Sequence, residues 1–277
     1  MNEEIVSIEH PTSLAQIRRR FKPDADVLVY NGFPVSTEKA ESTIVVDGST
    51  VVLIRRGQIP LMHELEALMM ARHTPGVHER MKNAVVGIAG AGGLGSHVAM
   101  ALARVGIGTL VIADFDVVEP SNLNRQVFTV DQIGEPKVEA LKDNTLKANP
   151  FVTVQPHCVR LTAGNIAGIF TDVNILVEAL DVPREKVMLV NVFSKHFPRI
   201  PVVMASGVAG YAPSNWIKTA RVGEFLYVVG DMKTAAEEGQ GLMAPRVGVA
   251  AHHQANQVIR LILGQTEQDG AGDGDTE

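Results

Sequence analysis

A glycine-rich loop follows directly after a buried-type strand near the middle of this chain. Residues 84–89 form a continuous apolar run, which predicts a strand covered on both faces. The next six residues, Gly90-Ala91-Gly92-Gly93-Leu94-Gly95, fit the pattern G-x-G-x-x-G, and apolar residues at Val98, Leu102 and Val105 predict a helix after them. Glycines at these positions allow a sharp turn and let a phosphate approach the N–H groups of the helix. The pattern predicts a nucleotide-binding turn, with a tight strand–helix turn that binds no ligand as the alternative.

Strands and helices alternate through the rest of this region. Further apolar runs predict strands, and segments with helical spacing predict helices between them. In chain order these segments are 109–113 (strand), 137–149 (helix), 152–154 (strand), 175–177 (strand), 184–197 (helix) and 201–204 (strand). Such alternation is typical of an α/β fold with a doubly wound, mostly parallel sheet.

The first sixty residues show a different pattern. Residues 13–21 carry apolar side chains spaced for one face of a helix, and residues 27–30, 43–46 and 51–54 are β-type runs. The Asp47-Gly48 pair between the last two runs predicts a hairpin. We therefore expect a small α+β unit in front of the α/β region.

These patterns divide the chain into four parts. They are the α+β unit at 1–60, a linking helix within 61–80, a nucleotide-binding domain at 81–264 and an acidic tail at 265–277 that is predicted to be disordered. The tail holds five acidic residues and no base, so subtracting it from the net charge of −6 leaves −1 for the rest. A nearly neutral body argues against a nucleic-acid-binding surface.

Composition excludes several other classes of protein. No apolar run approaches the roughly 20 residues of a membrane span, and the acidic start, Met1-Asn2-Glu3-Glu4, is unlike a secretory signal. A single cysteine, Cys158, excludes a disulfide framework and a zinc site built on paired cysteines. We expect a soluble cytoplasmic protein in which Cys158 packs as a small apolar residue.

Polar residues after the second strand bear on the kind of nucleotide. Asp114 ends that strand 24 residues beyond Gly90, where a carboxylate can accept ribose hydroxyls. Up to this point the pattern suits a dinucleotide or ATP. Arg125 and Lys137 follow, and two cations suit a triphosphate better than they suit a nicotinamide ring. In the alternative interpretation, Arg125 is a surface ion-pair residue and Lys137 lies in the exposed first turn of a helix.

Further motifs join the glycine loop and these cations. They are Asp114-x-Asp116, Ser121-Asn122-Leu123-x-Arg125-Gln126, Gly134-x-x-Lys137, Asn149-Pro150, Glu178-Ala179-Leu180-Asp181 and Gly241-Leu242-Met243-Ala244-Pro245. Together they resemble the ThiF/MoeB/HesA-type adenylyltransferases, whose Rossmann-like fold is shared with the ubiquitin-activating enzymes. The resemblance covers roughly residues 81–264 and is closest to the short, zinc-free type of ThiF.

The first sixty residues resemble, more weakly, a ThiS-like ubiquitin-type domain. A working carrier of that type ends in Gly-Gly with a free carboxylate. Here the chain continues through Gly57-Gln58-Ile59-Pro60 into the predicted linking helix. This domain is therefore expected not to be the substrate, and an assembly role or a pseudo-substrate role remain the two alternatives.

The resemblance implies a reaction and its partners. It implies ATP-dependent adenylylation of the C-terminal glycine carboxylate of a small sulfur carrier protein, ThiS, for thiamine thiazole biosynthesis, with release of pyrophosphate. It also implies Mg²⁺ as a cofactor, no zinc, and a cytoplasmic homodimer without a nucleic-acid or membrane partner.

The resemblance also assigns residues to this site. Mg²⁺ would be held by Asp181, and a family arginine that reaches ATP from the partner subunit would correspond to Arg72. The remaining residues would surround the nucleotide: Gly90, Gly92, Gly93 and Gly95 under the phosphates, Asp114 at the ribose, Asn122, Arg125 and Lys137 at the triphosphate, and Asp116 and Ser121 nearby. Arg125 and Lys137 are expected at the surface of the cleft.

Some features depart from the family pattern or have other interpretations. Val182 stands where the family has asparagine after the metal aspartate, which puts one nucleotide contact in doubt, and segment 235–240 lacks the cysteine that some relatives use in sulfur transfer. Asp181 alone could instead cap the helix that follows it. Other functions left open are activation of another carrier or of a tRNA-borne carboxylate, a nicotinamide-dependent oxidoreductase, and a ubiquitin-like binding module without catalytic activity.

Overall fold

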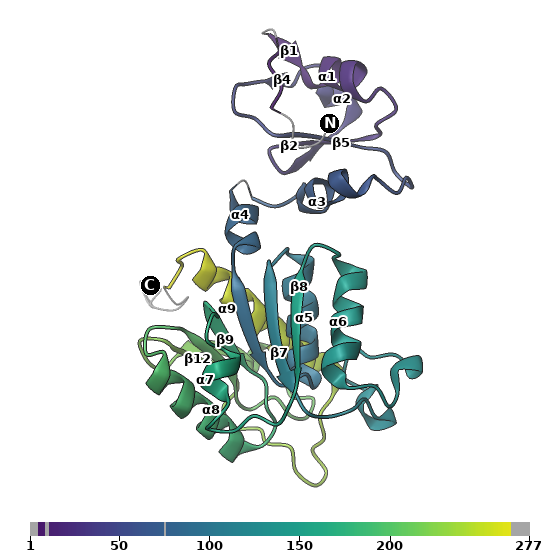
Figure 1. Ribbon diagram of the computed structural model, residues 1–277. Helices are drawn as coiled ribbons and strands as arrows, with labels where there is room; N and C mark the ends of the chain where they lie inside the picture. The colour runs from purple at the N-terminus through teal and green to yellow at the C-terminus, as the bar shows by residue number, and fades with distance from the viewer. Residues whose placement is uncertain (1–4, 9–10, 75, 267–277) are drawn as a thin grey trace, which may run out of the picture. The chain divides into compact units, whose positions relative to one another are not determined.

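The computed structural model describes residues 5–8, 11–74 and 76–266. The chain separates into two compact units, Met1–Glu79 and Arg80–Glu277, with α4 (Val77–Lys82) spanning the boundary (Figure 1). Most of the predicted acidic tail, residues 267–277, lies outside the described residues. Within the described parts of the chain, no helix is both long enough and apolar enough to cross a membrane.

The larger unit is built on a seven-stranded sheet with the order β11-β12-β10-β9-β6-β7-β8. All neighbouring strands pair in parallel except β11, which runs antiparallel to β12. The strands are β6 (Val85–Ala89), β7 (Thr109–Asp114), β8 (Thr153–Cys158), β9 (Ile175–Glu178), β10 (Val202–Ala205), β11 (Lys218–Arg221) and β12 (Leu226–Gly230).

The order of these strands confirms the predicted doubly wound α/β fold. The chain moves outward from β6 through β7 to β8, and then returns to the other side of β6 to build β9, β10 and β12. The two halves of the sheet therefore diverge between β6 and β9. In open α/β sheets, ligands bind at this switch point, beyond the carboxyl ends of the strands.

Helices cover the sheet in two layers (Figure 1). In one layer, α5 packs against both α6 and α9, and α9 also contacts β10. In the other, Ile166 of α7, Phe170 directly after that helix and Phe193 of α8 share a buried cluster with Leu176 of β9 and Val202 of β10. The helices are α5 (Gly93–Arg104), α6 (Lys137–Ala148), α7 (Ile166–Ile169), α8 (Pro183–His196) and α9 (Ala244–Ile262), with short 3₁₀ turns at Pro120–Asn122, Val130–Gln132 and Ser214–Trp216.

The smaller unit contains two small sheets, β3-β2-β5 and β1-β4. Its first helix begins at a reciprocal cap, in which the Ser13 hydroxyl accepts from the Gln16 N–H at 3.2 Å and the Gln16 side chain accepts from the Ser13 N–H at 2.8 Å. The elements are β1 (Thr12–Ser13), α1 (Leu14–Phe21), β2 (Val27–Tyr30), β3 (Phe33–Val35), α2 (Thr37–Ala40), β4 (Ile44–Val45), β5 (Val51–Ile54) and α3 (Met62–Met70).

The three-stranded sheet of this unit is covered on both faces. On one face, Leu28 and Leu53 pack with residues of α1. On the other, Val29 and Val52 pack with Ala71, and Leu68 of α3 lies against the same cluster. Successive strand residues point to opposite faces, so the apolar runs of β2 and β5 face α1 on one side and the α3 segment on the other.

The predicted hairpin at Asp47-Gly48 is wrong. The strands on either side of it belong to different sheets, because β4 pairs with β1 while β5 pairs with β2. The two-residue hairpin of this unit lies instead at Asn31-Gly32, between β2 and β3. Both residues have positive φ, 49° and 85°, as a type I′ turn requires. Turn residues mark where the chain reverses, whereas the pairing depends on which strands share a core.

Candidate nucleotide-binding site

The predicted site residues lie at the carboxyl ends of three neighbouring parallel strands. Gly90 follows β6, Asp114 ends β7, and Asp181 lies shortly after β9. Since β6 pairs with both β7 and β9, these three positions meet at the switch point of the sheet. The structure therefore brings together segments that are about ninety residues apart in sequence.

The glycine loop is closely packed against its surroundings. Gly90 has a φ of +100°, and a Cβ there would lie 2.7 Å from the Ala179 carbonyl oxygen. A Cβ on Gly95 would lie 1.8 Å from the Gly90 oxygen, so any side chain there would collide with the loop. Gly92 is the N-cap of α5 and provides no side-chain hydrogen bond, and α5 carries no acidic residue in its first turn. The first N–H groups of α5 thus remain suited to an anion.

Asp114 joins this loop to the segment that follows β7. One carboxylate oxygen, Oδ2, accepts from the Ala91 N–H at 2.6 Å, and Oδ1 accepts from the Asp116 N–H at 2.8 Å. A carboxylate has about four lone-pair sites, so each oxygen can accept one more hydrogen bond. The predicted ribose contact is compatible with this arrangement and stays a prediction.

Lys137 begins α6 and is buried, which differs from its expected position at the cleft surface. Its Nζ lies 2.9 Å from Asp116 Oδ2, and the two side chains are 7% and 47% exposed. The alternative of an exposed first turn is therefore wrong. The Lys137 N–H also donates to the Asp116 carbonyl, which closes the segment 116–137 into a loop.

Arg125 lies beside the start of α5. Its Cγ is 3.6 Å from the position of a Cβ on Gly93, and its Nη1 donates to the Ser121 carbonyl at 3.0 Å and to Asn124 Oδ1 at 2.7 Å. Ser121 is exposed. Asn122, which follows Ser121, is buried, and its Oδ1 accepts from the Glu119 N–H at 3.0 Å. Asn122 thus shapes the segment that carries Arg125.

Asp181 is exposed and does not cap the helix that follows. The N-cap of α8 is Val182, whose side chain makes no capping hydrogen bond. The alternative interpretation of Asp181 as a helix cap is therefore wrong.

Among the described residues, no three histidine, cysteine, aspartate or glutamate side chains gather into a metal-binding group.

Arg72 belongs to the smaller unit, where it is exposed shortly after α3. Its role across a subunit boundary stays a prediction.

Cys158 is exposed, which contradicts its expected place in the core. It is the last residue of β8 and pairs directly with Asp114 in the sheet. Edge strands leave one side of the backbone uncovered, and β8 is the edge strand next to β7. Cys158 therefore lies next to Asp114 of the candidate nucleotide site.

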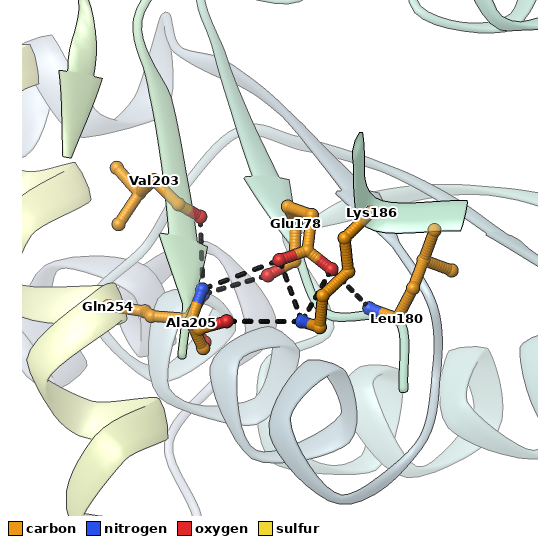
Figure 2. A network of polar contacts seen from close by, with 6 residues as sticks. All are labelled: Glu178, Leu180, Lys186, Val203, Ala205 and Gln254. Atoms are coloured by element: carbon orange, nitrogen blue, oxygen red, sulfur yellow. Dashed lines mark hydrogen bonds and ion pairs between the residues drawn. The ribbon is translucent and has the colours of Figure 1, made fainter. Parts of the chain in front are cut away.

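Glu178, at the end of β9, is a buried polar residue to which the sequence analysis assigned no role. Both carboxylate oxygens of Glu178 lie 2.9 Å from Lys186 Nζ, and Glu178 Oε1 accepts from the Leu180 N–H at 2.7 Å (Figure 2). Glu178 is fully buried, and this burial raises its pKa, although Lys186 acts in the opposite direction. The sequence signal that could have indicated this buried pair is an acid at the end of an otherwise apolar strand, with a lysine eight residues later.

A second buried ion pair joins the end of β12 to α9. Arg246 Nη2 lies 2.6 Å from Asp231 Oδ2, and Arg246 Nη1 donates to the Ala212 carbonyl at 2.7 Å. Burial alone would raise the pKa of Asp231, but N–H donation by Thr234 and Lys233 and the charge of Arg246 hold it below its usual value. This pair anchors the loops that precede α9.

The chain is similar to curated adenylyltransferases. It is 32% identical over 205 residues to the adenylyltransferase and sulfurtransferase UBA4 of Saccharomyces cerevisiae, covering 71% of this chain and 46% of that protein. It is 39% identical over 104 residues to the probable adenylyltransferase/sulfurtransferase MoeZ of Mycobacterium tuberculosis, covering 37% of this chain and 26% of that protein. The chain thus spans less than half the length of these relatives.

Solved structures share the fold. E. coli tRNA N6-threonylcarbamoyladenosine dehydratase, TcdA, in complex with AMP, superposes with a TM-score of 0.67 at 19% identity, covering 75% of this chain and 98% of that chain. E. coli MccB, solved with AMPCPP and MccA, superposes with a TM-score of 0.55 at 26% identity, covering 74% of this chain and 64% of that chain.

Two family profiles match separate parts of the chain. Residues 1–57 match the ThiS-like ubiquitin family, and residues 65–273 match the ThiF family. The second match spans most of the sequence and includes every strand of the doubly wound sheet. This protein is therefore a member of the ThiF family.

Proposed function

We propose that this protein uses ATP to adenylylate the C-terminal carboxylate of a ubiquitin-like sulfur carrier protein and releases pyrophosphate. The observation that carries the proposal is the meeting of the glycine loop, Asp114 and Arg125 at the switch point of a ThiF-family sheet. The names of UBA4 and MoeZ, both adenylyltransferases, and the AMPCPP complex of MccB support it.

The residues at the switch point fit a bound nucleotide. A Cβ on Gly93 would lie 3.0 Å from Val247 Cγ1, so a side chain there would crowd the start of α5, where the phosphates are proposed to bind. The buried Oε1 of Gln126 has no hydrogen-bond partner within the described residues, and its Nε2 lies 3.9 Å from the position of a Cβ on Gly92. A buried amide without a partner is costly, and a ligand that bonds to it removes that cost.

Asp181 fits a magnesium ion that arrives with ATP. Mg²⁺ is usually bound by one or two carboxylates together with substrate phosphates and water, so a cage of three protein ligands is not required. When bound, the ion would offset negative charge on the phosphates. In this proposal Asp181 supplies the protein ligand at the edge of the sheet.

The chain's own residues match the electrostatic demand of the reaction. A terminal carboxylate has a pKa near 3.5, so it is already an anion at pH 7 and needs no general base. Its oxygen attacks the α-phosphorus, an oxygen–phosphorus bond forms, and the bond to the pyrophosphate leaving group breaks. Both reactants are negatively charged, so the site must provide cations and N–H donors. In the proposal Arg125, Lys137 and the first turn of α5 provide them.

The carrier is proposed to be a ThiS-type protein, which would place the reaction in thiamine thiazole synthesis. The ThiS-like match of residues 1–57 supports a link to that carrier family. A homodimer, with Arg72 of one subunit reaching the ATP of the other, completes the proposal.

The N-terminal unit is proposed to have a structural role rather than to act as a pseudo-substrate. The α3 segment covers the second face of its sheet through Leu68 and Ala71, so the unit has no open apolar sheet face at Val29 and Val52. A carrier mimic tethered near the carrier-binding site would also compete with the true carrier at an effective concentration of order mM. If the unit is a competitor, its removal tightens carrier binding; if it is structural, carrier affinity stays the same or falls.

The decisive experiment is carrier-dependent exchange of labelled pyrophosphate into ATP, measured with a panel of purified carriers. We expect exchange with one ubiquitin-like carrier that ends in Gly-Gly and none with the same carrier lacking its last glycine. Thermal stabilisation by ATP but not by NAD excludes the oxidoreductase alternative. Exchange with no carrier in the panel, despite ATP binding, would point to a different carboxylate such as one borne by tRNA.

A further inference from the structure

The carboxylate of Glu178 joins three elements of the larger unit at one point. Glu178 is the last residue of β9, and both of its carboxylate oxygens bond Lys186 of α8. Its Oε2 also lies 3.4 Å from the backbone nitrogen of Ala205, at the end of β10. Lys186 Nζ also donates to the Ala205 carbonyl at 3.1 Å, so the ammonium group has three oxygen partners (Figure 2).

A helix from the opposite layer reaches the backbone at the same place. The side-chain Nε2 of Gln254, in α9, donates to the Glu178 carbonyl at 2.9 Å and to the Val203 carbonyl at 3.1 Å. Gln254 and Glu178 are both fully buried. The end of β9 is therefore held by its own carboxylate and by polar groups from both helical layers.

This network controls the short turn that carries Asp181. Glu178 Oε1 accepts from the Leu180 N–H at 2.7 Å, which fixes the direction of the chain one residue before Asp181. Ala179 lies between Glu178 and Leu180. Its carbonyl oxygen would be 2.7 Å from a Cβ added to Gly90, and its N–H donates to the Ala89 carbonyl at 2.9 Å. The same turn is thus bonded to the network on one side and packed against the glycine loop on the other.

Stability alone does not account for a charged pair in this position. Replacing a buried ion pair with apolar residues of similar volume is often neutral or stabilising, because desolvation offsets the attraction between the charges. A carboxylate with two oxygens, however, can bond a backbone N–H and an ammonium group at the same time, which an apolar side chain cannot do. The pair therefore offers geometric control of the turn.

We infer that Glu178 and Lys186 are positioning residues, which hold the turn 178–181 so that Asp181 faces the nucleotide beside the glycine loop. The inference rests on the proposed function, in which Asp181 binds the magnesium ion of ATP. Neither Glu178 nor Lys186 is proposed to touch the substrate.

The test compares three variants of the full-length protein. Glu178→Gln combined with Lys186→Met removes both charges, so that no unpaired charge is left buried. Lys186→Arg keeps a cation beside Glu178. Glu185→Gln is the matched control, because Glu185 lies on the same helix but accepts from the exposed Arg160 at 2.9 Å, at the surface.

Two readouts separate positioning from a general structural effect. The first is amide hydrogen exchange at Leu180 in the protein without nucleotide, compared among variants of similar melting temperature. The second is ATP affinity with Mg²⁺ and with EDTA. In the double variant we expect roughly tenfold faster exchange at Leu180 and a roughly 10- to 100-fold loss of Mg²⁺-dependent ATP affinity, as is usual when a partner of a metal ligand is removed. ATP affinity in EDTA should change by less than about threefold.

The control variant Glu185→Gln should match the wild type in both readouts, and Lys186→Arg should recover most of the loss. If the double variant does not fold, the single variant Glu178→Gln takes its place as the loss variant. Lys186→Arg remains the variant that keeps the cation. Unchanged Leu180 exchange, or equal losses of ATP affinity with Mg²⁺ and with EDTA, would overturn the positioning role while leaving the proposed function intact. Failure of the wild-type protein to bind ATP would instead overturn the proposed function.

Discussion

The Nζ of Lys137 lies 2.9 Å from Oδ2 of Asp116, in an ion pair whose lysine is buried and whose aspartate is half exposed. The pair is continuous with the glycine loop, because the Asp116 N–H donates to Asp114, which in turn accepts from Ala91. Burial of the lysine stem fixes the ammonium group, whereas the aspartate side chain can turn toward solvent. Under the proposed function, a phosphate of ATP takes the place of Asp116 beside Lys137.

Lys137→Ala should lower the adenylation rate roughly 10²-fold or more, since one preorganised cation is lost from a site where negative charge accumulates. It should also lower the free energy of unfolding by about 1 kcal/mol, because the ion pair is partly buried. Pyrophosphate exchange and urea unfolding measure the two effects. The control is Lys142→Ala, on another face of α6. Near wild-type exchange by Lys137→Ala would contradict the triphosphate role.

Arg125→Ala should lower the adenylation rate by a similar factor of roughly 10². Its melting temperature should stay near that of the wild type, because the guanidinium bonds to Ser121 and Asn124, which belong to its own segment. Exchange kinetics and thermal unfolding, with exposed Arg104→Ala at the end of α5 as the control, test this. A variant that melts early and retains its rate would show that Arg125 has a structural role.

Asp181→Asn should reduce turnover and flatten its dependence on Mg²⁺ concentration, because an amide is a weaker ligand for a hard cation than a carboxylate. Folding should be unaffected, since Asp181 is exposed and is not the cap of α8. Exchange rates across a Mg²⁺ titration provide the measurement, with exposed Asp172→Asn as the control. A fully active variant with normal Mg²⁺ dependence would exclude Asp181 as the metal ligand.

Cys158 should react with iodoacetamide in the folded protein, because the thiol is exposed at the end of β8. Saturating ATP should slow the labelling, since Cys158 pairs with Asp114, the proposed ribose ligand. Cys158→Ser should keep both adenylation and sulfur transfer in a reconstituted system. Mass spectrometry of the labelled chain follows the first two effects. Labelling that requires denaturant would contradict the exposure, and a variant that adenylates but no longer transfers sulfur would give Cys158 a chemical role.

Gly95→Ala should destabilise the larger unit by roughly 1–3 kcal/mol, the usual cost of overpacking. Its Cβ would lie 1.8 Å from the Gly90 oxygen, so the glycine loop would have to move. Gly248→Ala, within α9 and with nothing within 4 Å of its Cβ, should instead stabilise by roughly 0.5–1 kcal/mol, because glycine is unfavourable in a helix. Urea unfolding of both variants measures the free energy of unfolding, which should fall for Gly95→Ala and rise for Gly248→Ala. Equal changes in the two variants would show that the glycine loop can move at little cost.

Much of the larger unit could be predicted from local sequence. The buried apolar run before Gly90, the glycine spacing and the helix start at Lys137 each depend on residues within a few positions of one another, and the structure contains all three. The same is true of α1, which ends at Phe21 as its periodicity predicts and begins one residue after the predicted start, at Leu14. Local patterns of this kind determine secondary structure because helix and strand geometry repeat over short distances.

Other features depend on which segments become neighbours in space. The pairing of β4 with β1, the burial of Lys137 and the exposure of Cys158 were decided by strand order and edge positions, which no short segment encodes. Glu178 is the clearest case, because its ammonium and amide partners come from α8, β10 and the turn after β9. The sequence by itself determined the glycine turn and the strands and helices around it, and only the tertiary structure decided the environment of each charge, because burial and pairing arise when distant segments pack together.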